Sequence, residues 1–131
     1  MILVDSSVWI DYFNGKKTTK TDWLDSALGN EQIITGDLIL IEVLQGFQSD
    51  NDFKTAKKLL STFPFMKMVG KELAIKSALN YRLLRKNGVT VRKTMDVMIG
   101  TFCIHYQVSL LHDDRDFDPI ENLLKLKTIK T

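Results

Sequence analysis

Residues 2–7, Ile2-Leu3-Val4-Asp5-Ser6-Ser7, form a short apolar run that ends abruptly on a carboxylate. The same pattern recurs near the other end of the chain, where residues 109–111, Ser109-Leu110-Leu111, lead into residues 112–117, His112-Asp113-Asp114-Arg115-Asp116-Phe117. An apolar run bounded by polar residues is typical of a buried strand in a parallel sheet. Ligands of open α/β sheets bind just beyond the carboxyl ends of such strands. Two strands that deliver acids to that edge therefore predict a metal site.

Strand-like and helix-like segments alternate along the chain, a pattern that predicts a parallel sheet with right-handed crossovers. Strands are expected at 2–5, 33–35, 66–69 and 109–111, with a candidate fifth strand at 126–129. Helices are expected at about 6–14, 21–28, 37–46, 50–63, 71–86 and 94–106. The expected fold class is therefore α/β, with a small, mainly parallel sheet of four to five strands flanked by helices.

The composition fits one globular domain over residues 1–131. Hydrophobic residues make up 44% of the chain and charged residues 26%, which excludes a disordered protein. No apolar run approaches the roughly 20 residues that a bilayer span needs, so we expect no membrane association. The N-terminus shows no basic leader, and the single cysteine, Cys103, fits a reducing compartment. We therefore expect a cytoplasmic protein.

Basic residues gather in clusters although the net charge is only +2. The clusters are Lys54, Lys57 and Lys58; Arg82, Arg85 and Lys86; and Arg92 with Lys93. A local acidic site surrounded by basic helices is the pattern expected of a protein that handles a polyanion at a metal centre. Ordinary solvated helix faces are the competing interpretation, which we favour for the Lys54 cluster.

Two acids lie inside apolar helical segments. Glu42 is embedded in residues 40–44, and Asp96 opens the apolar segment 94–100, Thr94-Met95-Asp96-Val97-Met98-Ile99-Gly100. A charged side chain in such a run is costly to bury unless it pairs or binds a cation. Taken singly, each has an equally good structural explanation: Glu42 as a partly exposed helix residue, and Asp96 as a first-turn acid that complements the helix macrodipole.

The second strand end supplies three acids within four residues. In an extended loop, Asp114 and Asp116 project to the same side because side chains alternate, and Asp113 faces away. Asp116 has a competing local role as a cap of the Asp118-Pro119 turn, so Asp114 is the stronger candidate ligand. A carboxylate-rich site without His and Cys suits Mg²⁺ or Mn²⁺ and not zinc.

Four segments in register resemble the PIN-domain ribonucleases, and more narrowly the VapC toxins of bacterial and archaeal toxin–antitoxin pairs. They are residues 1–10 (Met1-Ile2-Leu3-Val4-Asp5-Ser6-Ser7-Val8-Trp9-Ile10), the embedded Glu42, residues 94–100, and residues 110–117. Each motif is weak alone, but together they are fairly specific and span essentially the whole chain. The resemblance implies a single PIN domain over residues 1–131 with a three-layer α/β/α fold and an acidic pocket for Mg²⁺, or alternatively Mn²⁺.

The resemblance also implies roles for individual residues. The implied catalytic acids are Asp5, Glu42, Asp96 and Asp114, and the implied metal ligands are Asp5, Asp96, Asp114 and Asp116. Ser6 matches a small hydroxyl position that forms hydrogen bonds near the metal. His112 stands where the family often has Thr, which departs from the pattern around the metal ligands. Its position in the loop favours a local hydrogen bond over contact with a phosphate.

The implied reaction is hydrolysis of RNA phosphodiester bonds by metal-activated water, which makes the protein an Mg²⁺-dependent endoribonuclease that inhibits translation. Arg82, Arg85 and Arg92 are the candidates for contacts with RNA phosphates. The implied partners are a second copy of the chain and a VapB-type antitoxin that blocks the site. Messenger RNA, initiator tRNA and ribosomal RNA loops all stay open as substrates, because specificity depends on RNA shape.

Two other functions remain open at this point. A receiver-type signalling module also groups acids around Mg²⁺, but it needs an acid pair after the first strand, where this chain has Asp5 followed by Ser6 and Ser7. A catalytically silent PIN-like module that only binds RNA is the second, and the full set of acids argues against it. Phosphoryl uptake from a small phosphodonor would identify the former, and RNA binding without cleavage the latter.

Overall fold

The computed structural model describes residues 1–131 and contains one parallel sheet. The strands lie in the order β3-β2-β1-β4, and every pair of neighbours is parallel. Their bounds are β1 Ile2–Val4, β2 Ile33–Gly36, β3 Phe65–Met66 and β4 Ser109–Leu111. The chain moves from β1 outward to β3 and then returns to the other side of β1 with β4. The strand order therefore reverses between β1 and β4, which is where open α/β sheets bind ligands.

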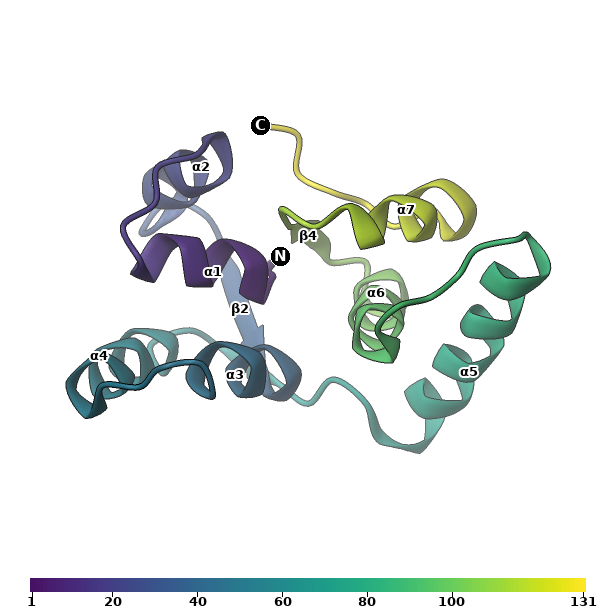
Figure 1. Ribbon diagram of the computed structural model, residues 1–131, viewed down its shortest axis with the longest axis horizontal. Helices are drawn as coiled ribbons and strands as arrows, with labels where there is room; N and C mark the ends of the chain where they lie inside the picture. Colours follow the sequence, from purple (N-terminus) through teal and green to yellow (C-terminus); the bar gives the residue numbers. More distant parts are fainter.

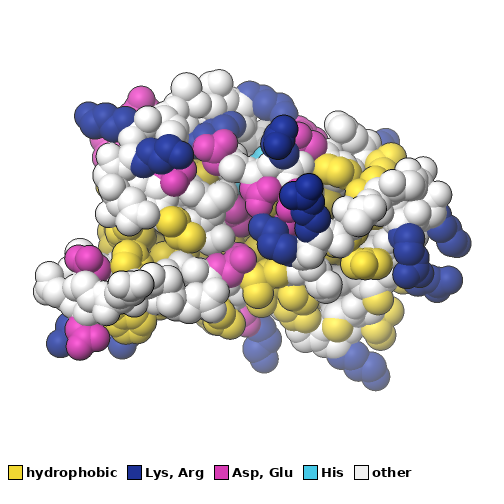
Figure 2. Space-filling model, in the orientation of Figure 1, with side chains coloured by type: hydrophobic (Ala, Val, Ile, Leu, Met, Phe, Trp, Pro, Cys, Tyr) yellow, Lys and Arg dark blue, Asp and Glu magenta, His cyan; other side chains and the backbone are white.

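Helices cover both faces of the sheet, which confirms the α/β prediction. The elements are α1 Ser6–Phe13, α2 Thr19–Ala27, α3 Asp37–Leu44, α4 Asp50–Leu60, α5 Gly70–Lys86, α6 Thr94–Tyr106, the 3-10 helix η1 Arg115–Phe117 and α7 Asp118–Leu124. Figure 1 shows α1 to α4 gathered on one side and α5 to α7 on the other, with the strands between them. Figure 2, in the same view, shows acidic side chains at the surface between these two groups of helices. No helix combines the length and the apolar character needed to cross a membrane.

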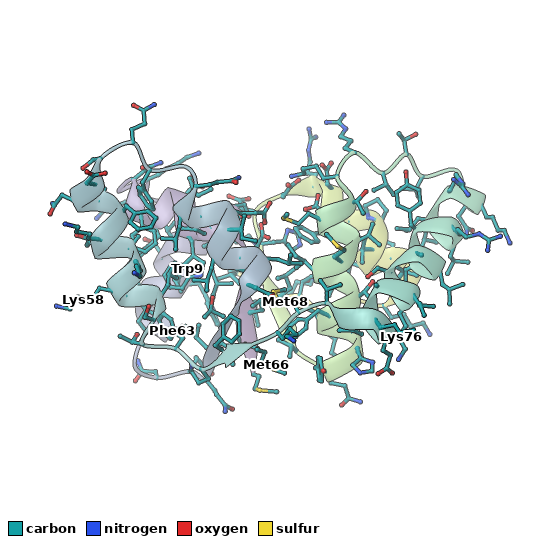
Figure 3. The ribbon with its side chains drawn as sticks, turned by 90° about the horizontal axis from the view of Figure 1, so that it is seen from below. Trp9, Lys58, Phe63, Met66, Met68 and Lys76 are labelled. Atoms are coloured by element: carbon teal, nitrogen blue, oxygen red, sulfur yellow. The ribbon has the colours of Figure 1, made fainter.

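The core forms because the three strands β1, β2 and β4 present apolar side chains to both layers of helices, whereas Phe65 of the edge strand β3 is exposed. Leu3 and Leu110, which pair across β1 and β4, have no exposed surface. On the α1–α4 side, the buried Trp9 ring stacks on Phe13 at 5.6 Å between centroids and lies 5.7 Å from Phe63. Figure 3 shows Trp9 and Phe63 close together inside that half of the molecule. Burying such continuous apolar strands from water on both faces is the main stabilising contribution.

The edge strand differs from its predicted position. We expected a strand at 66–69, but β3 covers Phe65–Met66, because Gly36 pairs with Met66 at the end of β2. Met68 has already left the sheet, and its backbone N–H donates to Asp37 Oδ1 over 3.1 Å. A Cβ atom on Gly36 would lie 2.4 Å from Met68 Cγ and Sδ, so only glycine fits there.

Two segments near the C-terminus differ from the structure expected for them. The candidate strand at 126–129 is a single parallel bridge between Leu110 and Thr128, so the sheet has four strands, within the predicted four to five. The expected turn at Asp118-Pro119 instead begins α7, with proline in the first helical turn. Proline is tolerated there because the first backbone N–H groups of a helix have no partner within the helix. Ile120 of α7 packs close to Gly100 of α6, where an added Cβ would lie 2.8 Å from Ile120 Cγ2.

Candidate metal centre

The ends of β1 and β4 lie side by side, as the two acid-terminated runs predicted. Val4 pairs with Leu111, and the backbone N–H of Asp5 donates to Leu111 O over 2.9 Å. The first turn of α6 contributes Asp96 to this edge, and α3 contributes Glu42. The structure thus brings the predicted acids, 109 residues apart at their extremes (5 to 114), to one place. Figure 2 shows Lys and Arg side chains next to this acidic group.

Three of the acids are close enough to share one cation. Asp96, Asp114 and Asp116 each offer a carboxylate oxygen, and these three atoms lie within 4.8 Å of one another. Ligands of an octahedral ion bound at about 2.1 Å are roughly 3.0 Å apart when adjacent and roughly 4.2 Å when opposite, so side-chain rotation would bring the three oxygens within reach of one ion. The Asp116 carboxylate does not cap α7, whose first turn has no side-chain cap hydrogen bond. Asp116 therefore belongs to the acid cluster and does not cap the segment at Asp118-Pro119.

The Asp5 carboxylate is held in place by Ser7, two residues later in the chain. It is the N-cap of α1, and its Oδ2 accepts from Ser7 N–H at 3.0 Å and from Ser7 Oγ at 2.6 Å. Ser7 Oγ in turn accepts from the backbone N–H of Asp113 at 3.0 Å, which ties the two strand ends together. Burial raises the pKa of Asp5 above its usual value, although the Ser7 hydrogen bonds counteract part of that effect.

Ser7 was missed among the predicted site residues. The N-cap of helix α1 is the Asp5 carboxylate and not a serine hydroxyl. An acid followed two residues later by a serine is the available signal, since an N-cap side chain accepts from the backbone N–H two or three residues on.

Glu42 is half-buried and takes its orientation from Ser6. Ser6 Oγ donates to Glu42 Oε1 at 3.1 Å, so the predicted hydroxyl of Ser6 lies within the site. Burial raises the pKa of Glu42, and the negative charge of Asp5 raises it further. A carboxylate that is partly open to solvent and binds protons more readily than usual can act as a general base.

Asp96 is held in the site at a large electrostatic cost. Its side chain is only 6% exposed, and burial together with the charges of Asp114, Asp5 and Glu42 raises its pKa to about 7. Lys93, one helical turn earlier, opposes this shift with its Nζ atom at 3.5 Å from Asp96 Oδ2. That separation is an ion-pair contact without hydrogen-bond geometry, and Asp96 Oδ2 has no hydrogen-bond partner.

Asp114 is the opposite case, because it is well paired. Lys93 Nζ donates to Asp114 Oδ2 at 2.9 Å, and the backbone N–H of Asp116 donates to Asp114 Oδ1 at 2.9 Å. Burial favours protonation, but these bonds outweigh it and hold the pKa of Asp114 below its usual value. The same bond raises the pKa of Lys93. Sequence reasoning missed Lys93 as a site residue, although it lies one helical turn before Asp96.

His112 and Asp113 have local roles in the loop. His112 Nδ1 accepts from the backbone N–H of Asp114 at 3.2 Å, and its ring packs on Phe117 with 4.8 Å between centroids. Burial lowers the pKa of His112, which keeps the ring neutral and able to accept this bond. The Asp113 side chain is exposed, as expected of a residue that faces away from the acids.

The three candidate phosphate-binding arginines occupy different places. Arg92, with Lys93, Asp96, Arg115 and Asp116, lines a cavity of about 70 Å³ beside the acids. Arg82 instead lines a groove of about 400 Å³ between α5 and α6, and Arg85 lies over the Tyr81 ring at 5.8 Å. The structure therefore brings Arg92 to the acidic site and leaves Arg82 and Arg85 on the surface of α5.

The chemistry of these donors fits a hard divalent cation. Asp5 Oδ1 and Asp96 Oδ2 are buried carboxylate oxygens without any hydrogen-bond partner. A buried acceptor without a partner costs about 1–3 kcal/mol, or more when charged, so two such carboxylate oxygens in one acidic site favour a bound cation. A cation among the acids would give both oxygens a partner. Oxygen-only donors match Mg²⁺ or Mn²⁺.

The reversed strand order, the helices on both faces and the acids at the β1–β4 edge are shared with a known family. Residues 2–123 match the PIN domain, and the chain belongs to that family. Ribonuclease VapC11 of Mycobacterium tuberculosis is 30% identical over 130 residues, which cover 97% of this chain and 96% of the relative. Within the PIN-domain family the chain is therefore grouped with the VapC proteins, as the four segments in register indicated.

Solved structures show the same fold at much lower sequence identity. The chain matches a chain of the VapBC2 complex from Rickettsia felis, which was solved bound to a DNA fragment from the promoter of VapBC2. The TM-score is 0.77, with 16% identity over 98% of both chains. The chain also matches FitAcB from Neisseria gonorrhoeae with a TM-score of 0.76 and 14% identity over 99% of this chain and 97% of that one. The three-layer arrangement is thus confirmed as that of PIN-domain proteins.

Proposed function

We propose that the protein is an Mg²⁺- or Mn²⁺-dependent endoribonuclease that acts as the toxin of a toxin–antitoxin pair, in a single PIN domain over residues 1–131. The observation that carries the proposal is the convergence of five acids at the β1–β4 edge, two of them with buried oxygens that lack a partner. The similarity to a VapC ribonuclease over nearly the whole chain supports RNA as the substrate.

The acids divide into metal ligands and a base. Asp5, Asp96, Asp114 and Asp116 would hold the cation, since their oxygens are buried or lie within the closest cluster. The bound cation would supply Lewis acidity and neutralise charge that develops on the phosphodiester. Glu42, oriented by Ser6 and open to solvent on one side, would accept the proton of the attacking water.

Basic residues beside the acids would position the RNA. Arg92 lines the cavity next to Asp96, so it is the arginine placed to contact the phosphate that reacts. Arg82 and Arg85 lie on α5, farther along the surface, where they would contact flanking phosphates of a longer RNA. Replacing either of these two would weaken RNA binding and reduce its salt dependence without preventing hydrolysis of a short substrate.

The decisive experiment compares Asp5→Asn with Asp113→Asn. Both changes remove one negative charge near the strand ends, but Asp5 is buried in the site whereas the Asp113 side chain is exposed. We expect the Asp5 variant to lose about a hundredfold of its Mg²⁺-dependent RNA cleavage, because even residues that only support a metal ligand cost about 10- to 100-fold when replaced. The Asp113 variant should keep its rate. Wild-type activity in the Asp5 variant would exclude the proposed site, and RNA binding without cleavage by the wild type would indicate a binding module.

Two partners follow from the toxin assignment. A VapB-type antitoxin would cover the acidic site, as the relatives solved as VapBC complexes suggest. Induced expression in the cytoplasm should arrest translation and growth, and co-expression of a VapB-type antitoxin that binds the protein should restore both. The Asp5→Asn variant should not arrest growth.

A second copy of the chain is the other proposed partner. Ile75, Leu79 and Leu83 of α5 are 54%, 56% and 43% exposed, and a homodimer interface would remove such apolar surface from water. Light scattering of the purified protein should give a mass near 30 kDa, twice the 15.0 kDa of one chain. A monomer at micromolar concentration would contradict the homodimer without affecting the proposed catalytic site.

A further inference from the structure

Lys93 places a positive charge among the carboxylates of the acidic site. Its Nζ atom is 2.9 Å from Asp114 Oδ2 and 3.5 Å from Asp96 Oδ2. These two carboxylates belong to the three whose oxygens lie closest together. Lys93 is the N-cap residue of α6, so its backbone is anchored by the helix while its side chain reaches across to the β4 loop.

The position of Nζ and the position of a shared cation exclude each other. A divalent ion bound by Asp96 and Asp114 would sit about 2.1 Å from an oxygen of each. An ammonium group that lies 3.5 Å from Asp96 Oδ2 and 2.9 Å from Asp114 Oδ2 stands between the same two carboxylates, and its charge repels the ion. The lysine side chain is 49% exposed, so it has an open route by which to leave.

No other basic residue takes this place. Arg92 and Arg115 line the neighbouring cavity, yet neither forms an ion pair with any of the acids. A lysine suits the position because its ammonium is a compact charge on a flexible stem, whereas an arginine fork needs a planar, two-pronged partner. The acid cluster would otherwise hold several negative charges in a partly buried space without a counter-charge, which is costly.

We propose that Lys93 is a tethered counter-cation that occupies the acidic site of the metal-free protein and leaves it when a divalent ion binds. Lys93 thereby stabilises the metal-free fold and weakens the affinity for the ion, because each binding event breaks its pairs with Asp96 and Asp114. The proposal rests on the proposed function only in requiring a divalent-ion site at those two carboxylates.

The test compares Lys93→Met with wild type and with Lys58→Met. Methionine keeps an unbranched stem of similar length and removes the charge. Lys58 is an exposed residue of α4 that Figure 3 places at the outer end of the other half of the molecule, so its variant controls for the same change in net charge. Mn²⁺ alone is titrated calorimetrically into each protein at pH 8 and constant ionic strength. Urea unfolding in EDTA measures the metal-free fold.

We expect Lys93→Met to bind Mn²⁺ about tenfold more tightly than wild type, a factor scaled down from the contact distances because the lysine is half exposed. The same variant should unfold at lower urea concentration in EDTA, and Lys58→Met should match wild type in both measurements. A Lys93→Arg variant, which restores the charge, should return the Mn²⁺ affinity toward the wild-type value.

Each remaining outcome has one meaning. Equal Mn²⁺ affinity in wild type and Lys93→Met, or weaker affinity in the variant, would overturn the counter-cation role while leaving the divalent-ion site intact. Failure of all the proteins to bind Mn²⁺ at millimolar concentration would overturn the metal site itself, and with it the proposed reaction. Tighter Mn²⁺ binding by Lys58→Met as well would attribute the effect to net charge and would also overturn the role of Lys93.

Discussion

Replacing Asp96 with Asn should make the metal-free protein more stable, although it removes a residue of the candidate site. The pKa of Asp96 rises from 3.8 to about 7 in the folded protein. A shift of roughly three pKa units corresponds to about 4 kcal/mol of folding free energy, at 1.36 kcal/mol per unit. The pKa of about 7 already includes the opposing attraction of Lys93, so the loss of that contact is not subtracted again. The expected net gain at pH 8 is therefore about 4 kcal/mol.

The sign of this effect depends on pH. Because the folded state binds the Asp96 proton more tightly than the unfolded state does, this carboxyl group destabilises the metal-free protein increasingly as pH rises from 3.8 to about 7. Below pH 4 the group is protonated in both states and the penalty disappears. The stability difference between Asp96→Asn and wild type should thus be small at pH 4, grow through pH 5 and 6, and level off above pH 7.

Urea unfolding followed by circular dichroism, in EDTA between pH 4 and 8, measures this difference directly. Adding Mg²⁺ at about a hundred times its dissociation constant should stabilise wild type by about 2.7 kcal/mol and leave the variant nearly unchanged. The reasoning would be refuted by an Asp96→Asn protein that is less stable than wild type at pH 8 in EDTA, or by a stability difference that does not change with pH.

Two further substitutions test how the fold holds the site. Ser7→Ala removes the bonds to Asp5 Oδ2 and to the Asp113 N–H, so it should lower the unfolding free energy by about 1–3 kcal/mol and reduce RNA cleavage at the same time; unchanged urea unfolding would contradict it. Gly36→Ala places a Cβ 2.4 Å from Met68 Cγ, and thermal unfolding should show a loss of about 1–3 kcal/mol, whereas a wild-type melting temperature would show that the chain after β3 moves freely.

The sequence predicted the sheet because its strands are buried on both faces and read as apolar runs. The edge strand β3 and the start of α7 were harder to predict, because contacts between residues distant in the sequence determine where they lie. β3 is shifted because Gly36 pairs with Met66, a partner that periodicity cannot reveal. Proline at 119 was interpreted as part of a turn, yet it begins α7, and only the packing of Ile120 on Gly100 distinguishes the two.

In the candidate site, too, the residues marked by a local sequence pattern were predictable, whereas those that depend on distant contacts were not. Asp5 and Asp114 were predictable because each ends an apolar run, and the parallel pairing of β1 with β4 brings such ends together. The sequence left Asp116 between a ligand role and a cap at the following proline; the structure lacks that cap and places Asp116 beside Asp96 and Asp114. Ser7 and Lys93 were not found, because their roles depend on the distances from their side chains to carboxylates of other elements.

The pairing of β1 with β4 also determines when, during synthesis of the chain, the acid cluster can first form. Ile2 pairs with Ser109, so the first strand has to wait for a partner that the ribosome makes more than a hundred residues later. At about 5–20 residues per second, that delay is roughly 5–20 s of synthesis. Contacts so distant in the sequence also form slowly once both strands exist. A growing or prematurely terminated chain therefore lacks the acid cluster, and the cell meets the complete site only with a nearly finished polypeptide.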